Sequence, residues 1–202
     1  AMIKPACAGG GILNRVVSNQ EELNTYLESL DKLQIPFKKE DMIVQDYLEG
    51  IPASVSLIST EDEARTIAIN EQLIGITWLT KLPFAYCGNI TPFITPYADQ
   101  MKNIAEELIL ELGLIGSNGV DFLITKDGPV IIEVNARFQG SLDTVEMSTG
   151  CNIFDAHMQA FNGIIEFREP VREQYASRAI LYGDSDKEIT DNIQSRILEN
   201  HV

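Results

Sequence analysis

Two strand-like runs joined by a short turn are the feature that most constrains how this sequence folds. Residues 119–125 and 129–134 are rich in apolar and β-branched side chains and flank Lys126-Asp127-Gly128, a combination typical of a β-hairpin. If the loop has three residues, Asp121 lies directly opposite Glu133. Like charges opposite one another are destabilising, so a cation is expected between them.

The hairpin should have one polar and one apolar face, because side chains alternate between the two faces of a strand. Asn135 and Arg137 share the face of the two acids. The apolar residues are expected on the opposite face: Phe122, Ile124, Ile132 and Val134. Two carboxylates and an amide oxygen suit Mg²⁺ or Mn²⁺. Two alternatives stay open: a solvated polar face with Arg137 neutralising one acid, or a two-residue loop at 127–128 that shifts Glu133 opposite Phe122.

A lysine followed by a glycine-rich loop lies near the start of the chain. Lys4 belongs to a strand end at residues 3–5, and Gly9, Gly10 and Gly11 follow it. Consecutive glycines let backbone amides approach an anion closely, and the lysine adds a positive charge. The segment is neither a Walker A loop nor a dinucleotide-binding fingerprint. Phosphate binding and a plain glycine turn both remain open from these residues alone.

The rest of the chain shows mixed helix and strand patterns. Helices are expected at residues 20–33, 97–112, 153–162 and 185–199, the first and last opened by Ser-x-x-Glu capping boxes at 18–21 and 185–188. Strands are expected at 42–47, 54–58, 65–69 and 177–181, and residues 83–96 read as a loop with short strands.

Composition narrows the class of protein. The chain has 202 residues, of which 45% are apolar, enough for a core in one or two domains. Its formal charge of −15 argues against nucleic acid as a partner. No apolar run approaches the roughly 20 residues that span a membrane. Three widely spaced cysteines, Cys7, Cys87 and Cys151, do not suggest a disulfide framework, so a cytoplasmic location is expected.

Four motifs occur along the chain in a fixed order. They are Lys4-Pro5 with the glycines at 9–11, VQDYLEG at 44–50, GVDF at 119–122 and IEVNAR at 132–137. In this order and spacing they resemble the ATP-grasp superfamily, in particular the carboxylate-amine ligase branch related to biotin carboxylase. GSLD at 140–143 is similar to the predicted ATP-dependent carboligases of that branch. The resemblance covers residues 3–163 and implies an α+β fold with a lid subdomain and a larger antiparallel-sheet subdomain.

The resemblance also implies a division of the chain. Residues 1–48 would form a partial lid with the glycine loop and hinge, 49–163 the C-terminal lobe of the ATP-grasp fold with the metal-binding hairpin, and 164–202 the start of an incomplete C-terminal domain. The N-terminal domain usual in the family would be missing before residue 3. We therefore expect a fold truncated at both ends, with that missing domain as a partner and a homodimer as a further prediction.

The resemblance implies ATP and Mg²⁺, or Mn²⁺, as cofactors. Lys4 and the backbone amides of Gly9, Gly10 and Gly11 would hold the α and β phosphates. Gln45 would hold adenine at the hinge, with the backbone around Tyr47 and Leu48, and Glu49 would contact the ribose.

The same resemblance implies a metal site and two catalytic residues. Asp121, Glu133 and Asn135 would hold the metal, and Arg137, acting with Lys4, would meet the γ-phosphate or an acyl phosphate. Several family members have Glu where Asp121 stands, which implies a looser or water-mediated metal contact here.

The activity implied is an ATP-dependent ligase that joins a small-molecule carboxylate to an amine, or to a thiol. An acyl phosphate would be the intermediate, with ADP and phosphate released, and the isolated chain would be weakly active or inactive. Two alternatives belong to other classes: an ATP-grasp kinase, and a non-catalytic nucleotide-binding module. His157, on a predicted helix, is interpreted as structural.

Overall fold

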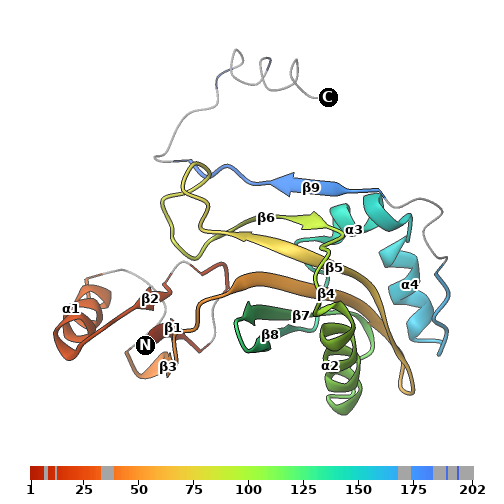
Figure 1. The fold of residues 1–202 in the computed structure, drawn as a ribbon, viewed down its shortest axis with the longest axis horizontal. Helices are drawn as coiled ribbons and strands as arrows, with labels where there is room; N and C mark the ends of the chain where they lie inside the picture. Colours follow the sequence, from red (N-terminus) through yellow and green to blue (C-terminus); the bar gives the residue numbers. More distant parts are fainter. Residues whose placement is uncertain are drawn as a thin grey trace.

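The chain forms two antiparallel sheets that lie side by side (Figure 1). The computed structural model describes residues 1–6, 9–11, 13–32, 39–167, 174–183, 190 and 195. The small sheet has the order β2-β1-β3. Its strands are β1 (Met2–Pro5), β2 (Arg15–Val16) and β3 (Met42–Gln45), accompanied by helix α1 (Gln20–Leu30) and the 3₁₀ turn η1 (Lys39–Asp41).

The large sheet has six strands in the order β8-β7-β4-β5-β6-β9. Its strands are β4 (Ile51–Ser59), β5 (Ala64–Ile74), β6 (Tyr86–Thr91), β7 (Gly116–Thr125), β8 (Gly128–Asn135) and β9 (Ala176–Ala179). Three helices accompany it: α2 (Ala98–Glu111), α3 (Leu142–Thr149) and α4 (Ile153–Ala160). Among the described residues no helix is both long and apolar enough to cross a membrane. This is the α+β architecture expected from the sequence.

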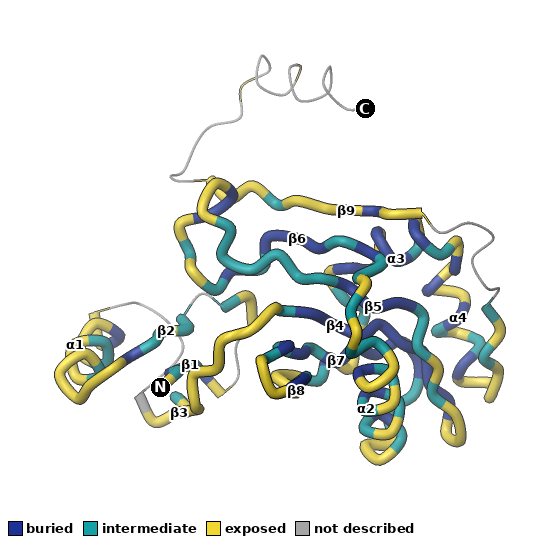
Figure 2. The backbone as a smooth tube through the Cα atoms, in the orientation of Figure 1, coloured by how far each residue is buried: buried dark blue, intermediate teal, exposed yellow. Residues whose placement is uncertain are grey.

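The main core lies between the large sheet and α2 (Figure 2). Met101, Ala105 and Ile109 follow one another at helical spacing on α2 and are fully buried. They pack against alternate residues of the strands, among them Val55, Val120 and Phe122. A second cluster packs α3 and α4 against the other face, around Ile58 and Val145. The rest of that second face is left for polar side chains.

The first helix begins at Gln20 as predicted, but its capping pair lies one residue later than the predicted capping box. Asn19, not Ser18, is the N-cap, and its Oδ1 accepts a hydrogen bond from the backbone N–H of Glu22 at 2.9 Å. The Glu22 carboxylate accepts in return from the backbone N–H of Ser18 at 2.8 Å. Asn caps as well as Ser does, so the shifted pair still satisfies two backbone N–H groups at the start of the helix, those of Ser18 and Glu22. The helix ends at Leu30, and the predicted end at 33 lies outside the described residues.

The hairpin of β7 and β8 has the predicted pairing of Asp121 with Glu133, but its loop and its register differ from the prediction. Thr125 pairs with Gly128, so the loop has two residues, Lys126 and Asp127; both predicted loops are wrong. A β-bulge beside Asp121 shifts the register by one residue, and Asp121 therefore still pairs with Glu133. Ile132 is the extra residue of the bulge. Unbroken alternation predicts Ile132 on the apolar face, but its side chain is 43% exposed.

Several other elements differ in extent. The predicted strands at 54–58 and 65–69 lie within the longer β4 and β5. Helix α3 was not predicted. It is short and ends at Thr149, and the C-cap residue Gly150 has the left-handed conformation typical of that position, with a φ of 72°. The predicted helix at 185–199 lies outside the described residues, apart from positions 190 and 195.

Candidate functional site

The open face of the large sheet carries a row of polar side chains. Asn70 on β5 pairs with Ser54 on β4, Ser54 pairs with Asp121 on β7, and Asp121 pairs with Glu133 on β8. Directly paired residues of neighbouring strands point to the same face. Asn135 belongs to the next row on the same face, because it pairs with Gly119 and Gly119 pairs with Ser56. The sheet therefore brings Asp121, Glu133 and Asn135 to one face.

Hydrogen bonds link the predicted metal ligands to Arg137. The Nδ2 group of Asn135 donates to Asp121 at 3.2 Å, and the Arg137 guanidinium donates to Asn135 Oδ1 at 2.8 Å. Arg137 also donates to the backbone carbonyl of Phe138 at 3.0 Å, which fixes its direction further. The predicted proximity of these side chains on one face is thus confirmed; their roles stay predictions.

Burial and the neighbouring Glu133 make the Asp121 carboxyl costly to ionise. Burial raises the pKa of Asp121 to about 6 from 3.8, against the effect of a hydrogen bond from Gln72, and the neighbouring Glu133 carboxylate raises it further. The hydrogen bond from Asn135 and the charge of Arg137 act in the opposite direction. A buried carboxylate that is costly to ionise is what a bound cation would relieve.

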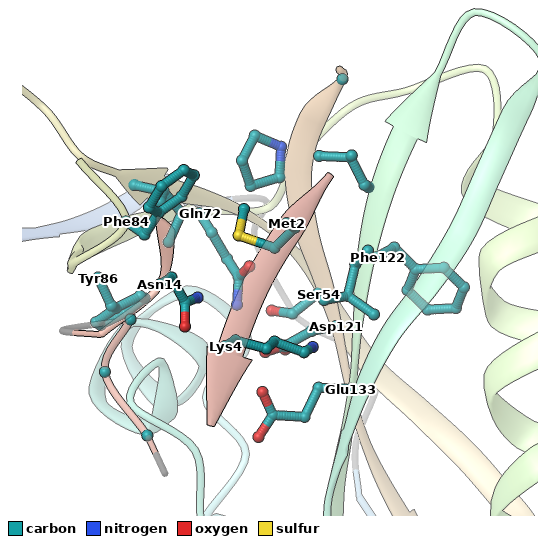
Figure 3. Close-up of a pocket in the computed structure, with 18 of the residues that line it drawn as sticks. Met2, Lys4, Asn14, Ser54, Gln72, Phe84, Tyr86, Asp121, Phe122 and Glu133 are labelled. Carbon is teal, nitrogen blue, oxygen red and sulfur yellow. The ribbon is translucent and has the colours of Figure 1, made fainter. Parts of the chain in front are cut away.

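The small sheet supplies the other wall of the site. Ile3 is buried while Met2 and Lys4 point to the opposite face, and Gln45 is the cross-strand partner of Met2. A pocket of about 840 Å³ lies between the sheets and is lined by Met2, Lys4 and Gln45 on one side and by Asp121 and Glu133 on the other. Figure 3 shows Lys4, Asp121 and Glu133 pointing into this cavity from the two sheets.

The glycine loop closes one end of the same pocket. Gly9, Gly10 and Gly11 all line it. Gly10 and Gly11 have φ values of 74° and 67°, which favour glycine. A β-carbon on Gly11 would overlap the backbone carbonyl of Phe84, in the segment between β5 and β6. The loop is therefore packed against the large subdomain as well as open to the pocket.

The hinge residues lie between the last strand of the small sheet and the first of the large one. Gln45, Tyr47, Leu48 and Glu49 line the pocket. Tyr47 and Leu48 are 45% and 41% exposed although both are large and apolar. A flat apolar ligand group such as a purine base could cover them.

The donor set fits a hard divalent cation in part. Asp121 and Glu133 offer carboxylate oxygens on one face, which Mg²⁺ prefers. Asn135 directs its NH₂ group, not its carbonyl oxygen, at Asp121, so its amide has to turn before its oxygen can join the same ion. Within the described part of the chain no group of three or more His, Cys, Asp or Glu side chains could hold a metal. Water molecules or phosphate oxygens commonly complete the coordination of Mg²⁺ at sites with few carboxylates.

Sequence reasoning missed several residues that line the pocket. They are Ser54 on β4, Gln72 on β5, Tyr86 on β6, and Gln139 and Ser141 after β8. Gln139 and Ser141 follow the end of β8 at Asn135, so the alternation of a strand gave no signal for them. Gln72 and Tyr86 become neighbours of Asp121 only through strand pairing. Burial raises the pKa of Tyr86 to about 12, so its hydroxyl remains a donor.

His157 has a structural position. Its Nδ1 accepts a hydrogen bond from the backbone N–H of Ser117 at 2.9 Å. Its ring packs against Phe138 and Phe161, with centroids at 4.8 and 5.1 Å.

Comparison with known proteins agrees with this architecture. The model of the ATP-grasp domain family matches residues 1–141, so the chain belongs to the ATP-grasp family. A biotin carboxylase from Campylobacter jejuni has the same fold, with a TM-score of 0.68 and 19% identity over 83% of this chain and 38% of that one. An L-amino acid ligase from Bacillus licheniformis gives a TM-score of 0.66 and 18% identity, over 91% of this chain and 46% of that one.

Curated relatives extend the comparison at the sequence level. An uncharacterized protein of Methanocaldococcus jannaschii is 30% identical over 75% of this chain and 34% of its own length. The 3-methyl-D-ornithine–L-lysine ligase of Methanosarcina barkeri is 25% identical over 86% of this chain and 42% of its own. The chain thus spans less than half of these relatives.

Proposed function

We propose that this chain forms the nucleotide-binding part of an ATP-dependent ligase that activates a small-molecule carboxylate as an acyl phosphate and joins it to an amine or thiol. The observation that carries the proposal is the pairing of Asp121 with Glu133 in a pocket that Lys4 enters from the opposite sheet. The relatives named as ligases for pairs of amino acids support an amine as the second substrate.

The residues of the small subdomain would bind and orient the nucleotide. Lys4 and the amides of the glycine loop would hold its phosphates, and the hinge from Gln45 to Glu49 would hold its base and ribose. Asp121, Glu133 and Asn135 would hold Mg²⁺ or Mn²⁺, which supplies charge neutralisation for the phosphates. Closing the glycine loop over the pocket would exclude water from a hydrolysable acyl phosphate.

Arg137 is the cation suited to the transferred phosphoryl group. Its charge acts on Asp121, and its guanidinium already donates to Asn135 and to the Phe138 carbonyl. Charge develops on phosphoryl oxygens during transfer, and a planar bidentate donor stabilises it. The attacking carboxylate is itself an anion, so this side chain would reduce the repulsion between the two reactants.

Hydroxylamine trapping tests the proposal. The full protein that contains this chain is incubated with Mg·ATP and a panel of amino acids, and acyl phosphate is detected as hydroxamate together with ADP. Glu133→Gln and Arg137→Ala should each lower hydroxamate formation about 100-fold or more, because the first removes a metal ligand and the second removes the positive charge next to the transferred phosphoryl group. Asp127→Asn, in the exposed turn of the same hairpin, is the matched control.

Two results contradict the proposal. A phosphate ester as the product shows a kinase instead of a ligase. Full activity in both Glu133→Gln and Arg137→Ala shows that these two residues take no part in the reaction. Calorimetry with a non-hydrolysable ATP analogue gives a separate check, since affinity that does not depend on Mg²⁺ contradicts the assignment of the carboxylates.

A further inference from the structure

A continuous set of buried polar side chains lies beneath the pocket, and we call it the buried polar chain. Its members, in spatial order, are Tyr86, Asn89, Thr91, Asn70, Ser56 and Gln139, with Thr144 attached to Asn89 and Thr91. Asn70, Asn89 and Thr91 are completely inaccessible to solvent. Tyr86 and Gln139, at its two ends, line the pocket. The set therefore begins and ends at the candidate site.

The first half of the buried polar chain has a defined donor direction. Tyr86 donates its hydroxyl proton to Asn89 Oδ1 at 2.7 Å. Asn89 Nδ2 then donates to Thr91 Oγ1 at 3.0 Å and to Thr144 Oγ1 at 2.5 Å. Thr91 thereby accepts on its oxygen and has one proton left to give.

The second half continues in the same direction. Thr91 donates to Asn70 Oδ1 at 2.6 Å, which fixes the oxygen side of that amide. Asn70 Nδ2 donates to Ser54 Oγ at 3.1 Å and to Ser56 Oγ at 3.0 Å. Ser56 gives its own proton to Gln139 Oε1 at 2.6 Å. Each group accepts from the preceding one and donates to the next, so the orientation of one amide determines the next.

Gln139 is held in a place that only a glycine opposite it permits. A β-carbon on Gly119 would overlap the side-chain amide nitrogen of Gln139. Gly119 is also the cross-strand partner of Ser56, so the amide lies over Gly119 while its oxygen is bound by Ser56. The NH₂ group is then the part of Gln139 that can donate to a ligand.

We propose that Asn70 is a positioning residue that, through Ser56, fixes the Gln139 amide with its NH₂ group presented to a ligand in the pocket. Burying several polar side chains in mid-sheet is less stabilising than apolar packing, and such networks specify one arrangement when every member is satisfied. The orientation of the Gln139 amide follows from the hydrogen bonds alone. The use of this amide in binding a reactant rests on the proposed function.

Asn70→Asp tests the proposal by reversing the donor direction. A carboxylate has no NH₂ group, so the Ser54 and Ser56 hydroxyls that accept from Asn70 become donors to it, and a Ser56 proton given to Asp at position 70 is no longer given to Gln139. In ¹H–¹⁵N spectra, the Gln139 side-chain amide of the wild type should give separated signals with a nuclear Overhauser contact to the α-protons of Gly119. Gln139→Glu assigns those signals by removing them. The contact should disappear in Asn70→Asp and in Ser56→Ala, and Ser56→Thr, which keeps the hydroxyl, should restore it.

Asn118→Asp is the matched control. Asn118 is also a buried strand asparagine, and its Nδ2 donates to Ser59 Oγ and to the Gly116 carbonyl, both at 2.9 Å, away from the pocket. This variant should lose stability but keep the contact between Gln139 and Gly119. If Asn70→Asp does not fold, loss of the contact in Ser56→Ala and its return in Ser56→Thr still test the step from Ser56 to Gln139 on which the role of Asn70 depends. A contact that survives in Ser56→Ala overturns the proposal.

A ligand titration tests the functional part. Orthophosphate added to the protein with saturating Mg·ADP should shift the Gln139 amide signals, and Ser56→Ala should raise the half-saturating concentration about tenfold, as expected for one lost hydrogen bond. Mg·ADP affinity should stay the same. Unchanged orthophosphate binding in Ser56→Ala overturns the positioning role. If the wild type forms no hydroxamate, the proposed ligase activity is refuted. The spectra still decide whether Asn70 orients the Gln139 amide.

Discussion

Replacing Asp121 by Asn should stabilise the metal-free protein at neutral pH. Burial raises the pKa of Asp121 to about 6 from the ordinary 3.8, with further repulsion from Glu133. The folded state therefore favours the protonated acid, and the stability from this group is complete below the unfolded-state pKa and lost as the pH rises through about 6. At about 1.4 kcal/mol for each pKa unit, the loss at pH 7 is about 3 kcal/mol.

Asn has nearly the shape of the protonated acid and never ionises. Thermal and urea unfolding of the wild type and of Asp121→Asn, measured without divalent metal from pH 4 to pH 8, should therefore diverge as the pH rises. At pH 7 the variant should melt about 6–12 °C higher, at roughly 2–4 °C for each kcal/mol in a chain of this size. Added Mg²⁺ with ADP should raise the melting temperature of the wild type and not of the variant.

The comparison has a built-in control and a clear refutation. Asp127→Asn removes an exposed carboxylate from the same hairpin, next to Lys126, and should follow the wild type across the pH range. A difference between the wild type and Asp121→Asn that does not change between pH 4 and pH 8 refutes the argument, because the penalty must follow the ionisation of this one group.

Three further predictions concern the packing around the site. Met101→Ala, in the core beneath the sheet, should cost about 2–5 kcal/mol in urea unfolding, and an unchanged midpoint contradicts the assigned core. Gly88→Ala should detach β9 from β6, because φ is 122° and the new β-carbon overlaps the Arg178 carbonyl; hydrogen exchange at β9 should rise while exchange in β4 stays slow. Burial raises the pKa of the Cys151 thiol to about 11, so iodoacetamide at pH 8 should modify it only after unfolding, and rapid modification of the folded protein refutes this.

Local patterns predicted much of the fold. The helix at 97–112 was predictable because its apolar residues repeat every three to four positions, and α2 spans Ala98–Glu111. The hairpin was predictable because two strand-like runs flank a turn. Its register was not, since a bulge at Ile132 compensates for a loop one residue shorter than expected. Sequence patterns carry no direct signal for such a compensation, because the bulge is a property of the pairing between β7 and β8.

The sequence alone determined which side chains could take part in phosphate and metal chemistry: a lysine before a glycine loop, and two acids with an amide and an arginine on paired strands. These follow from residue type and from the twofold repeat of a strand. Only the tertiary structure decided what surrounds them. Gln72 reaches Asp121, and Asn70 directs Gln139 through Ser56, because strands distant in the sequence pair side by side. Hydrogen bonds between such strands depend on register, and register is set by the packing of the whole sheet.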